Sequence, residues 1–335
     1  MSQSVIKTIK PLGFPWATQD PFLFCVYHKD DYPEGNEGMG PKASLEGRNI
    51  GQDFTIKDGW RMYHGSKVPG FPQHPHRGFE TITVVPEGLV DHSDSMGATG
   101  RFGKGDVQWM TAGKGVLHSE MFPLINRDKP NPLLLFQIWL NLPKRSKFVE
   151  PHYKMLWDDM IPTYQSPDGK TEIDVIAGEV NGTKAPSPTP DSWASDPSNE
   201  VAVWLIRMKP EAEFELPVSG TEINRSIYFY EGNELKINHT TLVIDQGADL
   251  HADQKTILKN GNQEARLLLL QGKPIGEPVV QHGPFVMNTQ QEIMEAMQDY
   301  QRTQFGGWPW PENEFVHPRE KGRFAKHADG AEEIK

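Results

Sequence analysis

The 335-residue chain has a single cysteine, Cys25, and no apolar run of about 18 residues. One cysteine excludes an intrachain disulfide and a thiolate metal cluster, and it is typical of a reducing compartment. The lack of an apolar run predicts that no segment spans a membrane, and residues 1–10 lack the apolar core of a signal peptide. We therefore expect a cytoplasmic protein, or a nuclear one if the source is eukaryotic.

Basic residues are also scarce, with 34 Lys and Arg against 45 Asp and Glu and a formal net charge of −11. Direct binding to nucleic acid is not expected, because phosphate contacts need a basic surface. The charge leaves open a regulatory role exerted through a protein partner.

Glycine (31 residues) and proline (28 residues) are abundant, which favours many turns and an all-β fold. Short runs with the composition of strands lie between turn signals in two blocks. In the first block these runs are Phe22–Tyr27, Glu80–Val85, Asp106–Thr111 and Leu133–Leu140. In the second block they are Glu172–Ala177, Val201–Met208, Ile227–Tyr230, Thr240–Ile244 and Ala265–Gln271.

Three other segments have distinct patterns. Asp30–Asp58 is polar and glycine-rich, and we expect a long excursion that is partly without fixed structure. Thr289–Glu292 has the spacing of a capping box, and apolar residues then recur with helical periodicity up to Tyr300, so a short amphipathic helix should end at Gly306-Gly307. The tail 308–335 should end in mobile residues.

The two β-rich blocks look like distant repeats, because TITVVPEG (81–88) has a counterpart in SIYFYEG (226–232). We expect a metal-binding first domain at 1–145 and a connector with the first strand of the second domain at 146–200. A metal-free second domain should follow at 201–287, and the helix and tail at 288–335.

Metal binding is expected in the first block from two pairs of residues. His74 and His76, and then His118 and Glu120, are each spaced i, i+2, which puts both side chains of a pair on one face of a strand. Two such strands side by side would direct three imidazoles and one carboxylate at a common point. Imidazole ligands suit divalent transition metals, and open positions on the ion favour iron over a closed structural zinc site.

The identity of the fourth ligand is open from spacing alone. Glu80 has the same strand parity as His74 and His76 and could face the metal if that strand continues unbroken. The compact His118-x-Glu120 pair favours Glu120, which leaves Glu80 an alternative ligand or a residue that supports the ligands by hydrogen bonding. His92 is expected in a loop as a hydrogen-bonding residue. Four aromatic residues are expected in the core or the pocket wall: Phe79, Trp109, Phe136 and Trp139.

Longer strings around these residues resemble one known family, the pirins. They are HPHRGFETIT (74–83), GDVQWMTAGKGVLHSEM (105–121), GEPVVQHGPFVMNTQQEI (276–293) and DYQRTQFGG (299–307). The resemblance covers roughly Lys7 to Gly307. It implies two cupin barrels (double-stranded β-helix, or jelly-roll) packed together with a short C-terminal α-helix, and metal in the N-terminal barrel only. Asp30–Asp58 and the tail after Trp308 look longer than is usual in the family.

Carried over residue by residue, the resemblance implies iron ligands at His74, His76, His118 and Glu120. It also implies two alternative functions. One is a dioxygenase of the quercetin 2,3-dioxygenase type, in which Fe(II), or another divalent transition metal, promotes reaction of a flavonol or similar small aromatic with O₂. Glu120 would then be the catalytic base. The alternative is an iron-dependent redox sensor or transcriptional co-regulator that acts through protein partners.

Overall fold

A computed structural model describes residues 4–335, and these residues form mainly β-strands. Within this part of the chain there is one α-helix, α1 (Gln290–Thr303), near the C-terminus. The chain divides into two compact units. We call Tyr27–Asp158 together with Glu277–Lys335 the first barrel, and the chain up to Val26 together with Asp159–Gly276 the second barrel. The expected all-β fold with two barrels and a short C-terminal helix is confirmed.

Neither barrel is continuous in sequence. The N-terminal strand β1 (Ile6–Pro11) pairs with β21 (Gln246–His251) and so belongs to the second barrel. The helix and the tail belong to the first barrel. The units therefore differ from the sequence-based division at 145, 200 and 287, because local patterns do not report which distant strand an end segment joins.

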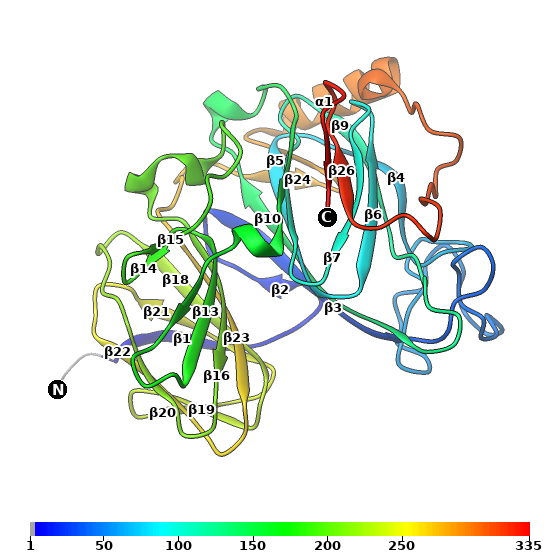
Figure 1. Cartoon of the computed structure of the whole chain (residues 1–335). Helices are drawn as coiled ribbons and strands as arrows, with labels where there is room; N and C mark the ends of the chain where they lie inside the picture. The colour runs from blue at the N-terminus through cyan, green and yellow to red at the C-terminus, as the bar shows by residue number, and fades with distance from the viewer. Residues whose placement is uncertain (1–3) are drawn as a thin grey trace. The chain divides into compact units, whose positions relative to one another are not determined.

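Two sheets form the first barrel (Figure 1). In one sheet the neighbouring strands are β11 (His152–Leu156), β8 (Val107–Thr111), β5 (Phe79–Glu87), β10 (Asn131–Asn141) and the part of β3 (Phe22–Tyr32) from Tyr27 on. The start of β3 and its partner β2 (Trp16–Ala17) fall in the second barrel. In the other sheet they are β27 (Glu332–Ile334), β26 (Phe324–Lys326), β7 (Thr99–Gly103), β6 (Leu89–Asp94), β9 (Val116–Met121) and β4 (Gly70–His76). All four strands expected in this block are present.

The second barrel also has two main sheets. The larger has the order β1, β21, β18 (Asn224–Glu231), β23 (Ala265–Gly272), β16 (Ala202–Met208), β13 (Thr171–Ala177) and β12 (Thr163–Gln165). The smaller has the order β17 (Glu213–Leu216), β22 (Thr256–Asn260), β19 (Glu234–Ile237) and β20 (Thr240–Val243), and β14 (Glu179–Val180) pairs with β15 (Thr183–Lys184). Its buried hydrophobic cluster joins aliphatic and aromatic side chains from both sheets, and their burial stabilises the packing of one sheet on the other.

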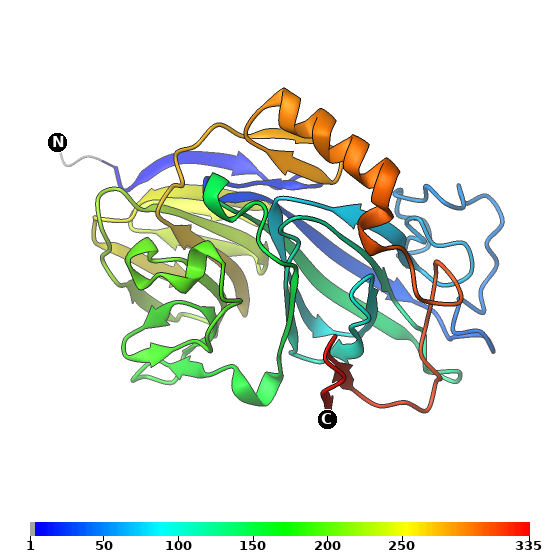
Figure 2. The same ribbon diagram turned by 90° about the horizontal axis from the view of Figure 1, so that it is seen from above.

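The helix α1 begins as expected. The Thr289 hydroxyl accepts from the Glu292 backbone N–H at 3.2 Å, and the Glu292 carboxylate accepts from the Thr289 backbone N–H at 2.9 Å. Ile293 and Ala296 are buried against Phe285 on β25 (Phe285–Met287), which pairs with β24 (Val280–His282). Figure 2 shows α1 in orange beside this short hairpin.

Two expectations about irregular segments are wrong. The excursion after β3 has a defined packing, because the Arg48 guanidinium lies 3.3 Å over the Trp60 ring and 3.0 Å from the Asp53 carboxylate. The tail is also structured to its end, since β26 pairs with β7 and β27 pairs with β26. Within residues 4–335, no helix is long and apolar enough to cross a membrane.

Candidate metal centre

The two predicted ligand pairs lie on adjacent antiparallel strands of the first barrel. β4 carries His74 and His76, β9 carries His118 and Glu120, and His74 is directly opposite His118. The register shifts between Phe71 and His74, so β4 has one extra residue there. β4 contains two prolines, which an edge strand tolerates because its outer N–H groups need no ladder partner.

Glycine at the start of β4 lets the two strands approach closely. Gly70 has φ +132°, and a Cβ atom at this position would lie 2.5 Å from the Glu120 carbonyl oxygen. Such a contact is impossible for any other residue without a shift of the backbone. Gly70 therefore keeps β4 in register with the part of β9 that carries Glu120.

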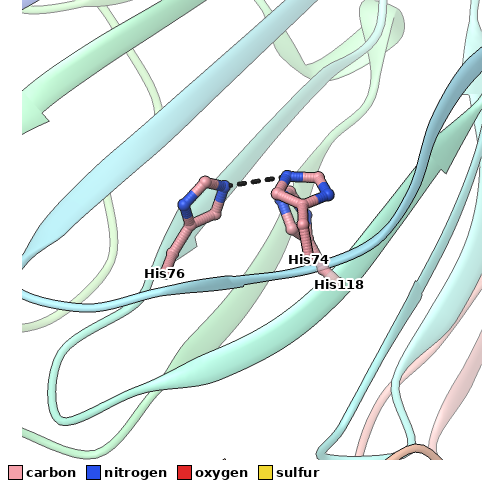
Figure 3. A group of neighbouring side chains, drawn as sticks. All are labelled: His74, His76 and His118. Carbon is pink, nitrogen blue, oxygen red and sulfur yellow. Dashed lines mark hydrogen bonds between the residues drawn. The ribbon is translucent and has the colours of Figure 1, made fainter. Parts of the chain in front are cut away.

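The three imidazole rings converge (Figure 3). Their centroids are 4.7 Å apart for His74 and His76, 4.5 Å for His74 and His118, and 4.7 Å for His76 and His118. Each ring has a nitrogen within 4.8 Å of a nitrogen of both others. The three imidazoles expected at a common point lie together, whereas the carboxylate expected with them is not part of this group.

The protonation states suit metal binding. Burial lowers the pKa of His74 to about 4 and the pKa values of His76 and His118 well below the usual range, so all three rings are neutral at pH 7. The His74 Nδ1–H donates to the Pro72 carbonyl at 2.8 Å, which leaves Nε2 with its lone pair 3.1 Å from Nε2 of His76. Neutral imidazoles with lone pairs directed inward are the form that binds a cation.

His118 gives the sharpest test of whether these residues fit a metal. It is fully buried, and neither of its ring nitrogens has a hydrogen-bond partner within residues 4–335. A buried polar group without a partner costs about 1–3 kcal/mol, and native proteins rarely leave one. A divalent cation among the three rings would supply the missing partner, so the donor set fits a transition metal.

Glu120 lies at the edge of this cluster. Its Oε2 is 3.9 Å from Nε2 of His118, and only 3% of its surface is exposed. Burial raises the pKa of its carboxyl group, and hydrogen bonds from Thr83 and Gln137 oppose that shift. The Thr83 hydroxyl donates to Oε1 at 2.9 Å, and the Gln137 amide donates to Oε2 at 2.5 Å. The carboxylate is therefore held close to His118 with both oxygens hydrogen-bonded.

Glu80 is not on the strand of the histidines. β4 ends at His76, and Gly78, with φ +87°, turns the chain into β5 of the other sheet. A Cβ at Gly78 would lie 2.1 Å from the Val286 carbonyl oxygen, so the turn depends on glycine. Glu80 is fully buried and accepts a hydrogen bond from Thr111 at 2.7 Å. The parity argument for Glu80 as a ligand fails because the strand does not continue.

His92 lies on strand β6, so the expectation of a loop is wrong. It is fully buried, and its Nε2 is 3.1 Å from the Asp94 carboxylate. Its ring stacks on Tyr153, with centroids 4.9 Å apart, and lies 5.5 Å from the His118 ring. The hydrogen-bonding role expected for His92 is therefore seen, one strand away from the candidate ligands.

An aromatic pair borders the histidines. Trp139 is half-buried, stacks on Phe79 with centroids 4.0 Å apart, and lies 5.2 Å from the His76 ring. The other two aromatic residues singled out from the sequence, Trp109 and Phe136, are fully buried in the core. Trp139 and the half-buried Gln137 share one face of β10, and His74 on β4 is also half-buried, so solvent reaches the site at these residues.

Sequence reasoning missed Thr83 and Gln137. Gln137 was visible as a signal, because it is the one amide within the apolar strand Leu133–Leu140. A polar side chain in such a strand needs a buried partner. Thr83 had no comparable signal, since threonine is common in strands for its shape alone.

Comparison with known proteins assigns the family. Residues 17–140 match the Pirin family, and residues 203–306 match the Pirin C-terminal cupin domain. Human Pirin is 34% identical over 291 residues, which are 82% of this chain and 91% of that protein. This chain belongs to the pirin family.

Two other similar proteins carry the name of an enzyme. A Pseudomonas aeruginosa protein provisionally named quercetin 2,3-dioxygenase is 37% identical over 238 residues, 70% of this chain and 79% of that protein. A crystal structure of quercetin 2,3-dioxygenase from Acinetobacter baumannii has 28% identity and a TM-score of 0.70, and the match covers 90% of this chain and 96% of that one. The chain thus has a two-cupin fold that it shares with the Acinetobacter baumannii structure.

Proposed function

We propose that this pirin is a metal-dependent dioxygenase that acts on a flavonol or a similar small planar aromatic with O₂. The convergence of the His74, His76 and His118 rings carries the proposal. The similarity to the Acinetobacter baumannii quercetin 2,3-dioxygenase supports the reaction class.

In this proposal His74, His76, His118 and Glu120 hold Fe(II), with other divalent transition metals as alternatives. Bound iron would act as a Lewis acid toward a substrate hydroxyl and would supply one-electron chemistry toward O₂. Three neutral imidazoles leave the charge of the ion largely in place, and one carboxylate compensates part of it. Glu80 supports the β5 strand through Thr111 instead of binding the ion.

The protein's own contribution is proton transfer and orientation. Glu120 is the candidate base, because its carboxylate is buried, lies next to His118 and can accept a proton from a substrate hydroxyl. Trp139 is half-buried beside the His76 ring, and we assign it contact with the aromatic substrate.

Oxygen uptake by Fe(II)-loaded protein with quercetin tests the proposal. Wild type should consume O₂ in the presence of the flavonol, and His74→Ala should lose this activity because one of three imidazoles is gone. His239→Ala, an exposed histidine in the second barrel, is the matched control and should retain it. Bound iron without uptake for quercetin would contradict the oxygenase and would favour the alternative, an iron-dependent redox sensor or transcriptional co-regulator with a protein partner.

A further inference from the structure

Glu120, the carboxylate of the candidate metal centre, is held from the opposite sheet. Glu120 projects from β9, while both of its hydrogen-bond donors, Thr83 and Gln137, lie on β5 and β10. The contacts are 2.9 Å from the Thr83 hydroxyl to Oε1 and 2.5 Å from the Gln137 amide to Oε2. The Gln137 amide serves Oε2 alone, whereas the single proton of the Thr83 hydroxyl has two acceptors within reach, Oε1 of Glu120 and Oε1 of Gln137.

Thr83 and Gln137 form a rigid unit. They are directly opposite each other in the β5–β10 pair, and Oγ1 of Thr83 lies 2.6 Å from Oε1 of Gln137. When the threonine proton points to Oε1 of Gln137, the amide oxygen accepts it and the amide nitrogen is turned toward Glu120. Because both residues sit on central strands of one sheet, their positions are fixed by the strand pairing.

Both donors are neutral, so they do not cancel the negative charge with which Glu120 would bind a metal ion. A lysine or arginine in place of Gln137 would form an ion pair with Glu120 and compete with a bound cation. An amide and a hydroxyl fix the carboxylate without cancelling its charge. The oxygen that Gln137 contacts, Oε2, is also the one 3.9 Å from Nε2 of His118.

We propose that Gln137 and Thr83 are positioning residues that hold the Glu120 carboxylate beside the three histidines and thereby set the affinity of the site for a divalent metal. The proposal rests on the metal site proposed above and adds two residues to it. Residues that hydrogen-bond to metal ligands typically contribute 10–100-fold to affinity.

Titration of the metal-free protein with Co(II), followed by its visible absorption, tests this directly. Gln137→Met keeps the length of the side chain and removes the N–H donor, so we expect affinity to fall by about 10–100-fold. The absorption bands of the bound Co(II) should also change, because a carboxylate that is no longer held coordinates differently. A loss of packing alone would leave the bands of the bound ion unchanged.

The strand β5 offers a matched pair of controls. Thr83→Val should lower affinity, and Thr83→Ser, which keeps the hydroxyl, should restore it. Thr81 is also fully buried on β5, but within residues 4–335 its hydroxyl has no hydrogen-bond partner. Thr81→Val should therefore leave Co(II) affinity within about twofold of wild type, an effect below the 10–100-fold range expected for Thr83.

A double-mutant cycle separates positioning from a general effect on folding. In a Glu120→Ala background, Gln137→Met should have almost no further effect on Co(II) affinity, since there is no carboxylate left to position. Equal losses with and without Glu120, or unchanged Co(II) bands in Gln137→Met, would overturn the positioning role while the metal site stands. Failure of the wild-type protein to bind Co(II) would overturn the metal site and this inference with it.

Discussion

At the scale of single residues, the first barrel buries two kinds of histidine. His118 has no hydrogen-bond partner within residues 4–335, which is why a metal fits there. His28 instead belongs to a closed network: its Nδ1–H donates to the Tyr63 hydroxyl at 2.8 Å, and that hydroxyl donates to Asp30 at 2.6 Å. The Arg61 guanidinium completes the network with two contacts of 3.0 and 3.1 Å to Asp30. Because the Nδ1–H of His28 is used in this hydrogen bond, we assign His28 a structural role.

This network predicts an acid-sensitive contribution to stability. Burial and the nearby Arg61 lower the pKa of His28 to about 3, whereas an unfolded histidine titrates near 6.5. Below pH 6.5 the unfolded chain takes up a proton that the folded chain refuses, so stability falls as the pH falls from 6.5 toward 3. Between pH 7 and pH 5 the loss from this one group should be about 2 kcal/mol.

Urea unfolding of metal-free wild type and His28→Gln at both pH values measures this contribution. Glutamine keeps a hydrogen-bond donor for Tyr63 and cannot titrate. The drop in unfolding free energy from pH 7 to pH 5 should be smaller in the variant by about 2 kcal/mol, since the other histidines are common to both proteins. An equal drop in the two proteins would show that His28 is not the group responsible.

At the scale of elements, the tail completes the first barrel through one buried arginine. Arg101 on β7 donates to both carboxylate oxygens of Asp91 at 2.6 and 2.7 Å. It also donates to the carbonyl oxygens of His317, Pro318 and Lys321 at 3.0, 3.0 and 2.8 Å. The arginine therefore fixes the path of the chain into β26, which covers the edge of β7.

We predict that Arg101→Met destabilises the protein by about 3–5 kcal/mol, because Asp91 is left buried without its partner. The tail should also become sensitive to limited proteolysis between residue 317 and β26. The double variant Arg101→Met/Asp91→Leu should recover part of the stability, since no buried charge remains, but its tail should stay cleavable. A tail that resists proteolysis in Arg101→Met would contradict the role given to the arginine.

Which strands end, continue or pair could not be predicted from the sequence alone. The i, i+2 spacing placed His74, His76 and His118 correctly, since strand parity is a local property. Strand parity gave a wrong prediction for Glu80 because the chain turns at Gly78. Parity also did not predict that His92 lies on β6 or that the tail contains β26. The local structure at Gly78 and in the tail depends on residues distant in sequence, because the Val286 carbonyl packs against Gly78 and β7 pairs with β26. Gln137 was recognisable as an amide within an apolar strand, but its hydrogen bond to Glu120 could not be predicted.

At the scale of the whole molecule, the two cupin barrels differ in their interior side chains. The first barrel holds three converging imidazoles with the Glu120 carboxylate 3.9 Å from His118, while the second has an apolar cluster that includes Trp204, Ile227 and Leu269. When TITVVPEG (81–88) is aligned on SIYFYEG (226–232) through Gly88 and Gly232, His74 and His76 fall on Val218 and Gly220, which lie outside the strands of the second barrel. The expectation that the second barrel holds no metal stays a prediction.

Core variants of the second barrel should therefore affect stability and metal binding differently. Leu269 is fully buried and lies between Trp204 and Ile227 of the neighbouring strands. We expect Leu269→Ala to lower the free energy of unfolding by about 2–5 kcal/mol through the cavity it leaves. The folded fraction should still bind one metal ion per chain, as measured by metal analysis after gel filtration. Loss of the metal from folded Leu269→Ala would contradict the assignment of the site to the first barrel.

The central claim is that His74, His76, His118 and Glu120 hold one divalent ion in the first barrel. Anaerobic calorimetric titration of metal-free protein with Fe(II), beside His118→Ala, tests it most directly. We predict that wild type binds about one ion per chain, because its four ligands form a single site. We predict no measurable binding for folded His118→Ala. Absence of binding in wild type, or equal binding in His118→Ala, would contradict the account.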